Sequence, residues 1–381
     1  MSGNIGEWSE AYIFLKLIYD EKVDVADGDM MPIKGVCLKI IQVIKTGIGK
    51  VKYHYFVGNP VKIQKNNALI AQVDKAYFGK NSAKIWQLIQ GKKGNKRTTF
   101  TDADVEAFLK SIFIANLSAS SRDTEDLEIE AMDFRTGISN IMGFSCKSDI
   151  DAPATLFNAS QDNTNFEFEV TGGMTDADME HFNAMFKTVT RKGQVSQDVA
   201  TGDRMRWLKG KGYDLEYVGP VRAAAARNLM MSGGKEMGAI VGGLLKHFYF
   251  EHAGSGQDGG DDMRAGTAYC AAHDVAGYGC DALEPMYRRK VSKLLYDMFT
   301  GMRLGKPWDG RSTVNGGYIV VKRDGSIVAY HSCMTEEFQD FLMAKLRLEA
   351  PSAKRHGDRV IERRGGKYFL KLALQVRFRL S

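Results

Sequence analysis

Two strand-like segments joined by a tight turn constrain the fold of this chain more than any other feature. LEIEAMDFRTG (127–137) and IMGFSCKSDI (141–150) are rich in apolar residues, and turn residues lie at Thr136–Gly137. Lys147 lies within the second segment, although lysines are rare in buried strands. The segments therefore predict an antiparallel hairpin within a sheet, with a lysine on one of its faces.

Further elements surround this hairpin. Residues 6–22 place apolar side chains at helical spacing, and 35–58 have the pattern of a strand hairpin. ATLFNAS (154–160) predicts a short helix before a strand at NFEFEV. Near the C-terminus, GGYIVVKRDGSIVAYHS (316–332) predicts a hairpin, and KYFLKLALQVRFRL (367–380) predicts one long strand.

This order of elements indicates an α/β or α+β fold, with a mixed central sheet flanked by helices. We expect three parts: an N-terminal part with the core sheet (1–173), a mainly helical region (174–310) and a strand-rich C-terminal part (311–381). Hydrophobic residues make up 44% and charged residues 26% of the chain, which is typical of a soluble globular protein. Five irregularly spaced cysteines favour a reducing cytoplasm over a disulfide framework. No apolar run predicts a signal peptide or a membrane span.

The lysine on the hairpin suggests phosphodiester chemistry. Hydrolysis of a phosphodiester needs a polarised phosphate, an activated water and charge relief at the leaving oxygen, and Mg²⁺ can meet all three needs. Mg²⁺ keeps several waters, so one or two carboxylates can hold it. Asp133 ends the first segment, and Ser145 and Lys147 project from one face of the second. We therefore predict a centre in which Asp133 binds the metal and Lys147 offsets the phosphate charge.

Several motifs resemble a known family. The chain contains, in one order, GEWSE (6–10), GFSCKSDIDAPATLFNAS (143–160) with TNFEFEV, NGGYIVVKRDGSIVAYH (315–331), LEAPSAKRHG (348–357) and LKLALQVRF (370–378). Together they resemble the HpaII-type type II restriction endonucleases, bacterial enzymes of the PD-(D/E)XK nuclease superfamily. The resemblance covers both ends of the chain and leaves about 190–284 unmatched. It implies Mg²⁺-dependent double-strand cleavage, with Asp133 and Lys147 as catalytic residues and, for the name-giving member, the site CCGG.

One position departs from the pattern of such nucleases. They usually carry Asp or Glu two residues before the lysine, where this chain has Ser145. Another carboxylate must then complete the metal site. Glu10 is the first choice, since it resembles the helix-borne acid of some superfamily members, and Asp149 on the lysine segment is the second. For each acid taken alone, the competing interpretation is an ordinary surface charge.

The C-terminal part is a candidate DNA-binding surface. Residues 348–380 concentrate lysines and arginines, which can contact phosphates, and the net charge of +6 agrees with a polyanionic partner. Gln375 and Arg377 project from one face of the predicted strand, and Arg pairs with guanine while Gln pairs with adenine. The predicted DNA-binding residues are Asn158, Asn165, Arg355, His356, Gln375 and Arg377. The asparagines also suit local turns, and a basic strand can merely protect a sheet edge.

These observations predict a bacterial, cytoplasmic, sequence-specific DNA endonuclease that acts as a homodimer on a palindrome. Such an enzyme requires a cognate methyltransferase to protect host DNA. A modification-dependent or structure-selective nuclease is the nearest alternative. A catalytically silent DNA-binding protein is the alternative from another class, and Ser145 is the residue that supports it.

Overall fold

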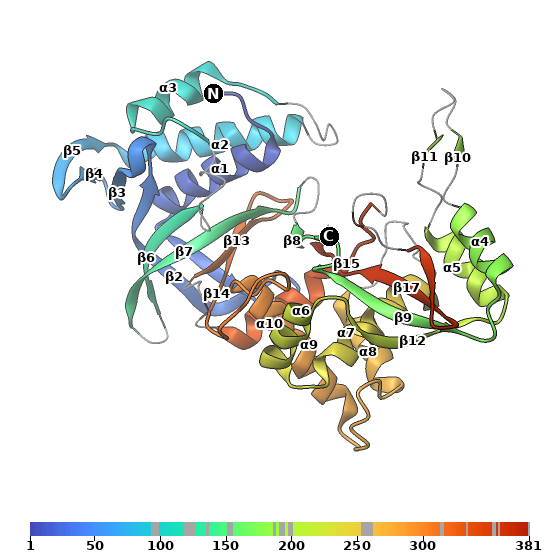
Figure 1. The fold of residues 1–381 in the computed structure, drawn as a ribbon. Coiled ribbons are helices and arrows are strands. Elements are labelled where there is room, and N and C mark those ends of the chain that lie inside the picture. The colour runs from blue at the N-terminus through green and yellow to red at the C-terminus, as the bar shows by residue number, and fades with distance from the viewer. Residues whose placement is uncertain are drawn as a thin grey trace. The chain divides into compact units, whose positions relative to one another are not determined.

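In a computed structural model, the chain divides into two units that each have their own sheets and helices. Unit 1 comprises Met1–Ala154, Val314–Phe341 and Leu380–Ser381, and unit 2 comprises Thr155–Thr313 and Leu342–Arg379. The structure describes residues 1–92, 99–117, 126–134, 137–150, 155–185, 188–189, 195–196, 201–252, 262–312, 316–332, 334–352, 356 and 359–379. Both units combine helices with sheets, so the predicted mixed α/β class, in its α+β form, is confirmed (Figure 1).

Unit 1 is built on a nine-stranded mixed sheet with the order β1-β14-β13-β7-β6-β2-β3-β4-β5. The β13–β7 and β1–β14 pairs are parallel, and the other pairs are antiparallel. Its strands are β1 Lys22–Ala26, β2 Pro32–Thr46, β3 Lys52–Phe56, β4 Val61–Lys65, β5 Ala68–Val73, β6 Leu127–Asp133, β7 Ser139–Ser148, β13 Gly317–Val321 and β14 Ile327–His331. Its helices are α1 Ile5–Asp20, a 3-10 turn Ile48–Lys50, α2 Lys75–Gly91, α3 Ala103–Ser111 and most of α10 Thr335–Lys345. The predicted hairpins at 127–150 and 316–332 are confirmed.

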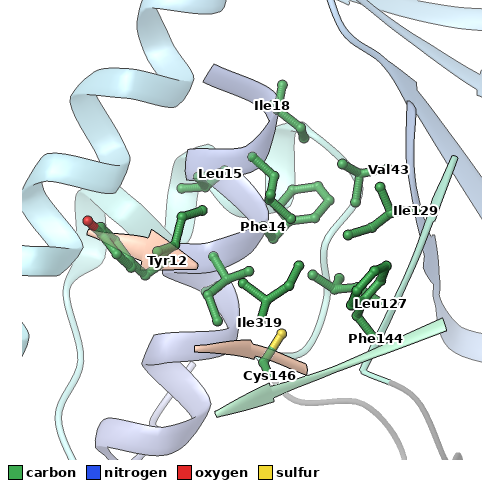
Figure 2. Packing of buried hydrophobic residues seen from close by; sticks show 14 of the residues in the cluster. Tyr12, Phe14, Leu15, Ile18, Val43, Leu127, Ile129, Phe144, Cys146 and Ile319 are labelled. Atoms are coloured by element: carbon green, nitrogen blue, oxygen red, sulfur yellow. The ribbon is translucent and has the colours of Figure 1, made fainter. Parts of the chain in front are cut away.

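Helix α1 anchors the core of unit 1. Asn4 caps it by accepting from the backbone N–H of Glu7, whose carboxylate accepts from the N–H of Asn4 in return. The buried face of α1 packs on one face of the sheet, where Phe14 meets side chains from β2, β6 and β7 (Figure 2). Helix α10 lies against the other face, since Phe338 makes an edge-to-face contact with Tyr318 of β13. The central hairpin is therefore held between helices.

The described residues of unit 2 form several helices and three small sheets. The sheet orders are β12-β9-β17-β16 and β15-β18-β8, and β10 pairs with β11. Its strands are β8 Thr155–Phe157, β9 Asn165–Thr171, β10 Thr188–Val189, β11 Val195–Ser196, β12 Asp214–Pro220, β15 Leu346–Leu348, β16 Ile361–Arg364, β17 Lys367–Ala373 and β18 Val376–Phe378. Its helices are α4 Asp176–Ala184, α5 Thr201–Gly210, α6 Ala223–Gly233, α7 Met237–Lys246, a π-helix His247–Glu251, α8 Met263–Ala272 and α9 Leu283–Phe299. Within the described part of the chain, no helix is long and apolar enough to cross a membrane.

Two predicted elements of unit 2 were wrong. Within ATLFNAS, Thr155–Phe157 form strand β8 instead of a helix, because Phe157 pairs with Val376 of β18 far away in the sequence. The predicted terminal strand is two strands that belong to different sheets, β17 and β18, and Leu374 and Gln375 separate them. Pairing with distant partners, which local patterns do not encode, decided both cases.

Candidate active site and nucleic-acid interface

The register of the β6–β7 hairpin does not bring Asp133 and Lys147 together. Asp133 lies at the turn, where its backbone N–H donates to the carbonyl of Ile138. Lys147 lies nine residues further along the second strand, about 30 Å away at about 3.3 Å per residue. Asp133 is buried beside β2, opposite Leu38. The expected pairing of these two residues is therefore corrected by the geometry of an antiparallel hairpin.

Asp126 occupies the place next to Ser145 and Lys147. Its backbone N–H donates to the carbonyl of Phe144 at 3.0 Å, which continues the hairpin register by one residue. Its carboxylate Oδ2 accepts from the backbone N–H of Cys146 at 2.7 Å. Asp126 thus lies opposite Ser145, and side chains of opposite residues share a face of a sheet. An acid, a hydroxyl and a lysine meet at this end of the hairpin.

Lys147 is held at the face that α10 partly covers. Ser145 and Lys147 alternate with the buried core residues Phe144 and Cys146, and they lie opposite Tyr318 and Val320 of the parallel strand β13. The Lys147 Nζ lies 5.3 Å from the centre of the Tyr318 ring. A cation at this distance is attracted by the ring quadrupole, so the buried tyrosine orients the amine.

Glu10 of α1 also acts on the hairpin, through its charge on Cys146. Burial raises the pKa of the Cys146 thiol well above its usual value, and the carboxylates of Asp126 and Glu10 raise it further. The ammonium groups of Lys45 and Lys147 lower the pKa of this thiol. The charges that act on this thiol therefore come from α1, β2, strand β7 of the hairpin and the residue before the hairpin. Lys45 is itself buried, and its Nζ has no hydrogen-bond partner within the described residues.

Asp149, the other candidate ligand, has a separate environment. It is buried, and its carboxylate lies 3.7 Å from the guanidinium of Arg323. Its backbone N–H donates to the carbonyl of Val321. The Arg323 contact partly offsets the charge of Asp149, and the role of Asp149 as a metal ligand stays a prediction.

The residues at the Asp126 end fit a hydrated Mg²⁺ ion. Among the residues that the structure describes, no three His, Cys, Asp or Glu side chains form a metal-binding group. A structural zinc, which needs four protein ligands, does not fit this donor set. Mg²⁺ needs only one or two carboxylates because it keeps water ligands. Asp126 and Glu10 are two carboxylates that both act on the Cys146 thiol, and Asp126 lies opposite the hydroxyl-bearing Ser145.

The predicted DNA-binding residues fall in unit 2, with different exposures. Asn158 is exposed beside β8, whereas Asn165 is fully buried and donates from its side-chain amide to the His356 carbonyl at 3.0 Å. Asn165 therefore supports the chain around His356 and has no surface to offer to a base. The His356 ring accepts from the backbone N–H of Gln161 at 3.4 Å. Arg355 lies outside the described residues.

Gln375 and Arg377 project in a common direction, as expected. The Gln375 amide donates to the Glu349 carboxylate at 2.6 Å, and Arg377 Nη1 donates to both carboxylate oxygens at 2.8 and 3.0 Å. Arg377 keeps 29% and Glu349 25% of its side chain exposed, so a ligand can reach both. Sequence reasoning did not identify Glu349, because only the β15–β18 pairing places it here.

Comparison with known proteins shows the class of protein to which this chain belongs. The model of the HpaII restriction endonuclease family matches residues 4–378. The type II restriction enzyme HpaII of Haemophilus parainfluenzae is 29% identical over 380 residues, which cover 99% of this chain and 98% of that protein. No solved structure matches the chain. The class is that of site-specific restriction endonucleases. Within it, the chain belongs to the HpaII restriction endonuclease family, which confirms the resemblance seen in the sequence.

Proposed function

We propose that this chain is a Mg²⁺-dependent type II restriction endonuclease that hydrolyses both strands of DNA at a GC-rich palindrome. We place its catalytic centre at Asp126, Glu10, Ser145 and Lys147, on a PD-(D/E)XK-like core formed by unit 1. One observation carries this assignment: the carboxylate of Asp126 accepts a hydrogen bond from the backbone N–H of Cys146. Cys146 lies between Ser145 and Lys147, the two residues of the proposed centre on this strand. The match of the family model over nearly the whole chain supports the reaction class.

The proposed roles follow from the chemistry of each side chain. Asp126 and Glu10 would hold a divalent cation, which would supply Lewis-acid polarisation of the phosphate. Lys147 places a positive charge where the phosphate gains negative charge, and it can hydrogen-bond the attacking water. Ser145 contributes a hydroxyl that can donate to a phosphate oxygen or accept from a water molecule. Tyr318 positions the lysine amine and excludes water from one side of it.

The family membership supports our proposals for the substrate and the partners. The type II restriction enzyme HpaII is a relative over the full length, and we propose a CCGG-like site for this chain as well. A twofold homodimer would match a palindrome, since protein symmetry mirrors the symmetry of the site. A restriction enzyme acts on DNA inside the bacterial cell, so we also propose that a cognate methyltransferase protects the host sequence.

The test uses Lys147→Ala and a matched control. Lys65 on β4 of the same sheet also holds its amine over a tyrosine ring, at 5.9 Å from the centre of Tyr53. We expect plasmid DNA to give discrete fragments with the wild-type and Lys65→Ala proteins in Mg²⁺, and none in EDTA. Lys147→Ala should bind the same site but not cut it, because its amine serves the chemical step.

The outcomes separate the candidate functions. Cleavage by Lys147→Ala at the wild-type rate would remove Lys147 from the centre. Specific binding without cleavage by the wild-type protein, on methylated and unmethylated DNA alike, would favour a silent DNA-binding protein. Cleavage only of methylated DNA would identify a modification-dependent enzyme.

A further inference from the structure

The small sheet β15-β18-β8 has one polar face. Arg347 of β15 lies directly opposite Arg377 of β18, and Arg377 pairs in turn with Thr155 of β8. The flanking residues of these strands are buried and form the opposite, apolar face; they are Leu346, Leu348, Phe157, Val376 and Phe378. Two arginines directly opposite each other repel, so this row is costly unless something offsets the charge.

Glu349 only partly offsets this charge. Its two oxygens accept from Arg377 Nη1, and one of them also accepts from the Gln375 amide. The amide oxygen of Gln375 accepts from the backbone N–H of Ala159 at 3.4 Å, which fixes the orientation of the amide. The Nε of Arg347 has no hydrogen-bond partner among the described residues. The face thus combines two guanidinium groups with the oriented carboxylate of Glu349, and Asp262 forms a backbone β-bridge with Arg347 at the edge of the sheet.

A carboxylate beside a guanidinium matches the major-groove edge of a C·G base pair. Cytosine presents its N4 amino donor there, next to the O6 and N7 acceptors of guanine. The carboxylate can accept from the amino group while the guanidinium donates to guanine. Thymine or guanine at the cytosine position would present an acceptor to the carboxylate, and this repulsion adds discrimination. Adenine also offers an amino donor, but it places the N7 acceptor beside it.

We propose that Glu349 is a specificity residue that reads a cytosine of the recognition site, with Arg377 on a guanine. This inference rests on the proposed function, and it assigns a base to a residue that the predicted set lacked. In the free protein the Glu349–Arg377 pair keeps both groups in register. On the correct site, Glu349 and Arg377 each replace one contact between them with a contact to a base edge. A wrong base would leave one of the two charges desolvated and without a partner.

The experiment measures base preference as well as rate. Glu349→Ala and Glu349→Gln are compared with Glu169→Ala, whose carboxylate is 22% exposed and accepts from Lys367 at 2.7 Å in the same unit. Each protein cuts a library of DNA duplexes randomised around the wild-type site, in Mg²⁺, and the cut molecules are sequenced. Thermal unfolding of each variant is recorded alongside.

We expect Glu349→Ala to relax the preference at one symmetry-related pair of positions and to leave the others fixed. Cleavage of the wild-type site should fall roughly tenfold to 100-fold relative to Glu169→Ala. Glu349→Gln, which keeps the shape of the side chain, should accept thymine or guanine there, because its amide can donate to O4 or O6. A purely structural role would lower the unfolding temperature and the rate on all sequences, with no change in preference.

The failures are distinguishable. If the wild-type protein neither cuts nor specifically binds DNA, the proposed function is overturned, and the role of Glu349 falls with it. If the wild-type protein cuts at a defined site and both Glu349 variants keep its preference at every position, the Glu349 assignment alone is overturned.

Discussion

The assignment of Asp126 to the catalytic centre is tested by two isosteric substitutions, Asp126→Asn and Asp133→Asn. Each removes one negative charge and keeps the shape of the side chain. Asp126 lies opposite Ser145, at the Lys147 end of the hairpin, and Asp133 lies at the turn. The two variants therefore compare the same chemical change at the two ends of one hairpin.

The distance between Asp133 and Lys147 fixes the expected magnitudes. At about 30 Å and an effective dielectric constant of about 20, two unit charges interact by about 0.5 kcal/mol. Salt at physiological strength, with a Debye length of about 8 Å, reduces this further. Asp133→Asn should therefore leave the cleavage rate within about threefold of wild type. Loss of a metal-binding carboxylate costs several kcal/mol of transition-state stabilisation, so Asp126→Asn should slow cleavage by about 10³-fold or more.

Single-turnover cleavage of supercoiled plasmid in saturating Mg²⁺ measures the chemical step for each variant. Thermal unfolding is needed as a control, because Asp133 is buried and its neutralisation can affect folding. Rates are compared at a temperature at which all three proteins are folded. A 10³-fold loss in Asp133→Asn together with wild-type cleavage by Asp126→Asn would refute the assignment and the register argument behind it.

Other predictions concern stability. Phe144→Ala should lower the free energy of unfolding by about 3–5 kcal/mol, because Phe144 is fully buried in the unit 1 core (Figure 2). Ile141→Ala on the same strand should change it by less than about 0.5 kcal/mol, since Ile141 is 48% exposed; denaturant titration measures both. Several hydrogen bonds lower the pKa of the Asp274 carboxyl, and the bond from the backbone N–H of Gly279 contributes most. A depressed carboxyl pKa stabilises the fold above the ordinary pKa and loses this effect as pH falls through the folded pKa. The unfolding temperature of Asp274→Asn should therefore lie below that of the wild type at neutral pH, and the gap should close on acidification below about pH 4; a constant gap would contradict the linkage.

Much of unit 1 could be predicted because its elements are encoded locally. The helix over 6–22 has apolar side chains at helical spacing, and the structure forms α1 there. The hairpins at 127–150 and 316–332 each join two strand-like runs through a short turn. In unit 2, by contrast, β8 and β18 pair across more than half the chain, so neither ATLFNAS nor the terminal segment could be assigned from local pattern.

The acid that we propose for the centre differs from the one that the sequence pattern favoured, although the hairpin register could have been worked out from the sequence. In an antiparallel hairpin the numbers of opposite residues have a constant sum, so a turn near 136 places residue 126 opposite residue 145. The strand pattern favours Asp133, because Asp133 is the last residue of the strand and lies closer to Lys147 in the sequence. Asp126 precedes the strand, so the pattern does not include it. Residues on the two strands of a hairpin are close in space when they lie equally far from the turn. Asp133 is close to the turn and Lys147 is far from it, so the two residues lie apart. The polar face with Arg347, Glu349 and Arg377 could not be worked out from the sequence in this way. Its strands β15 and β18 lie some thirty residues apart, with another strand pair between them, and only the folded register unites their side chains.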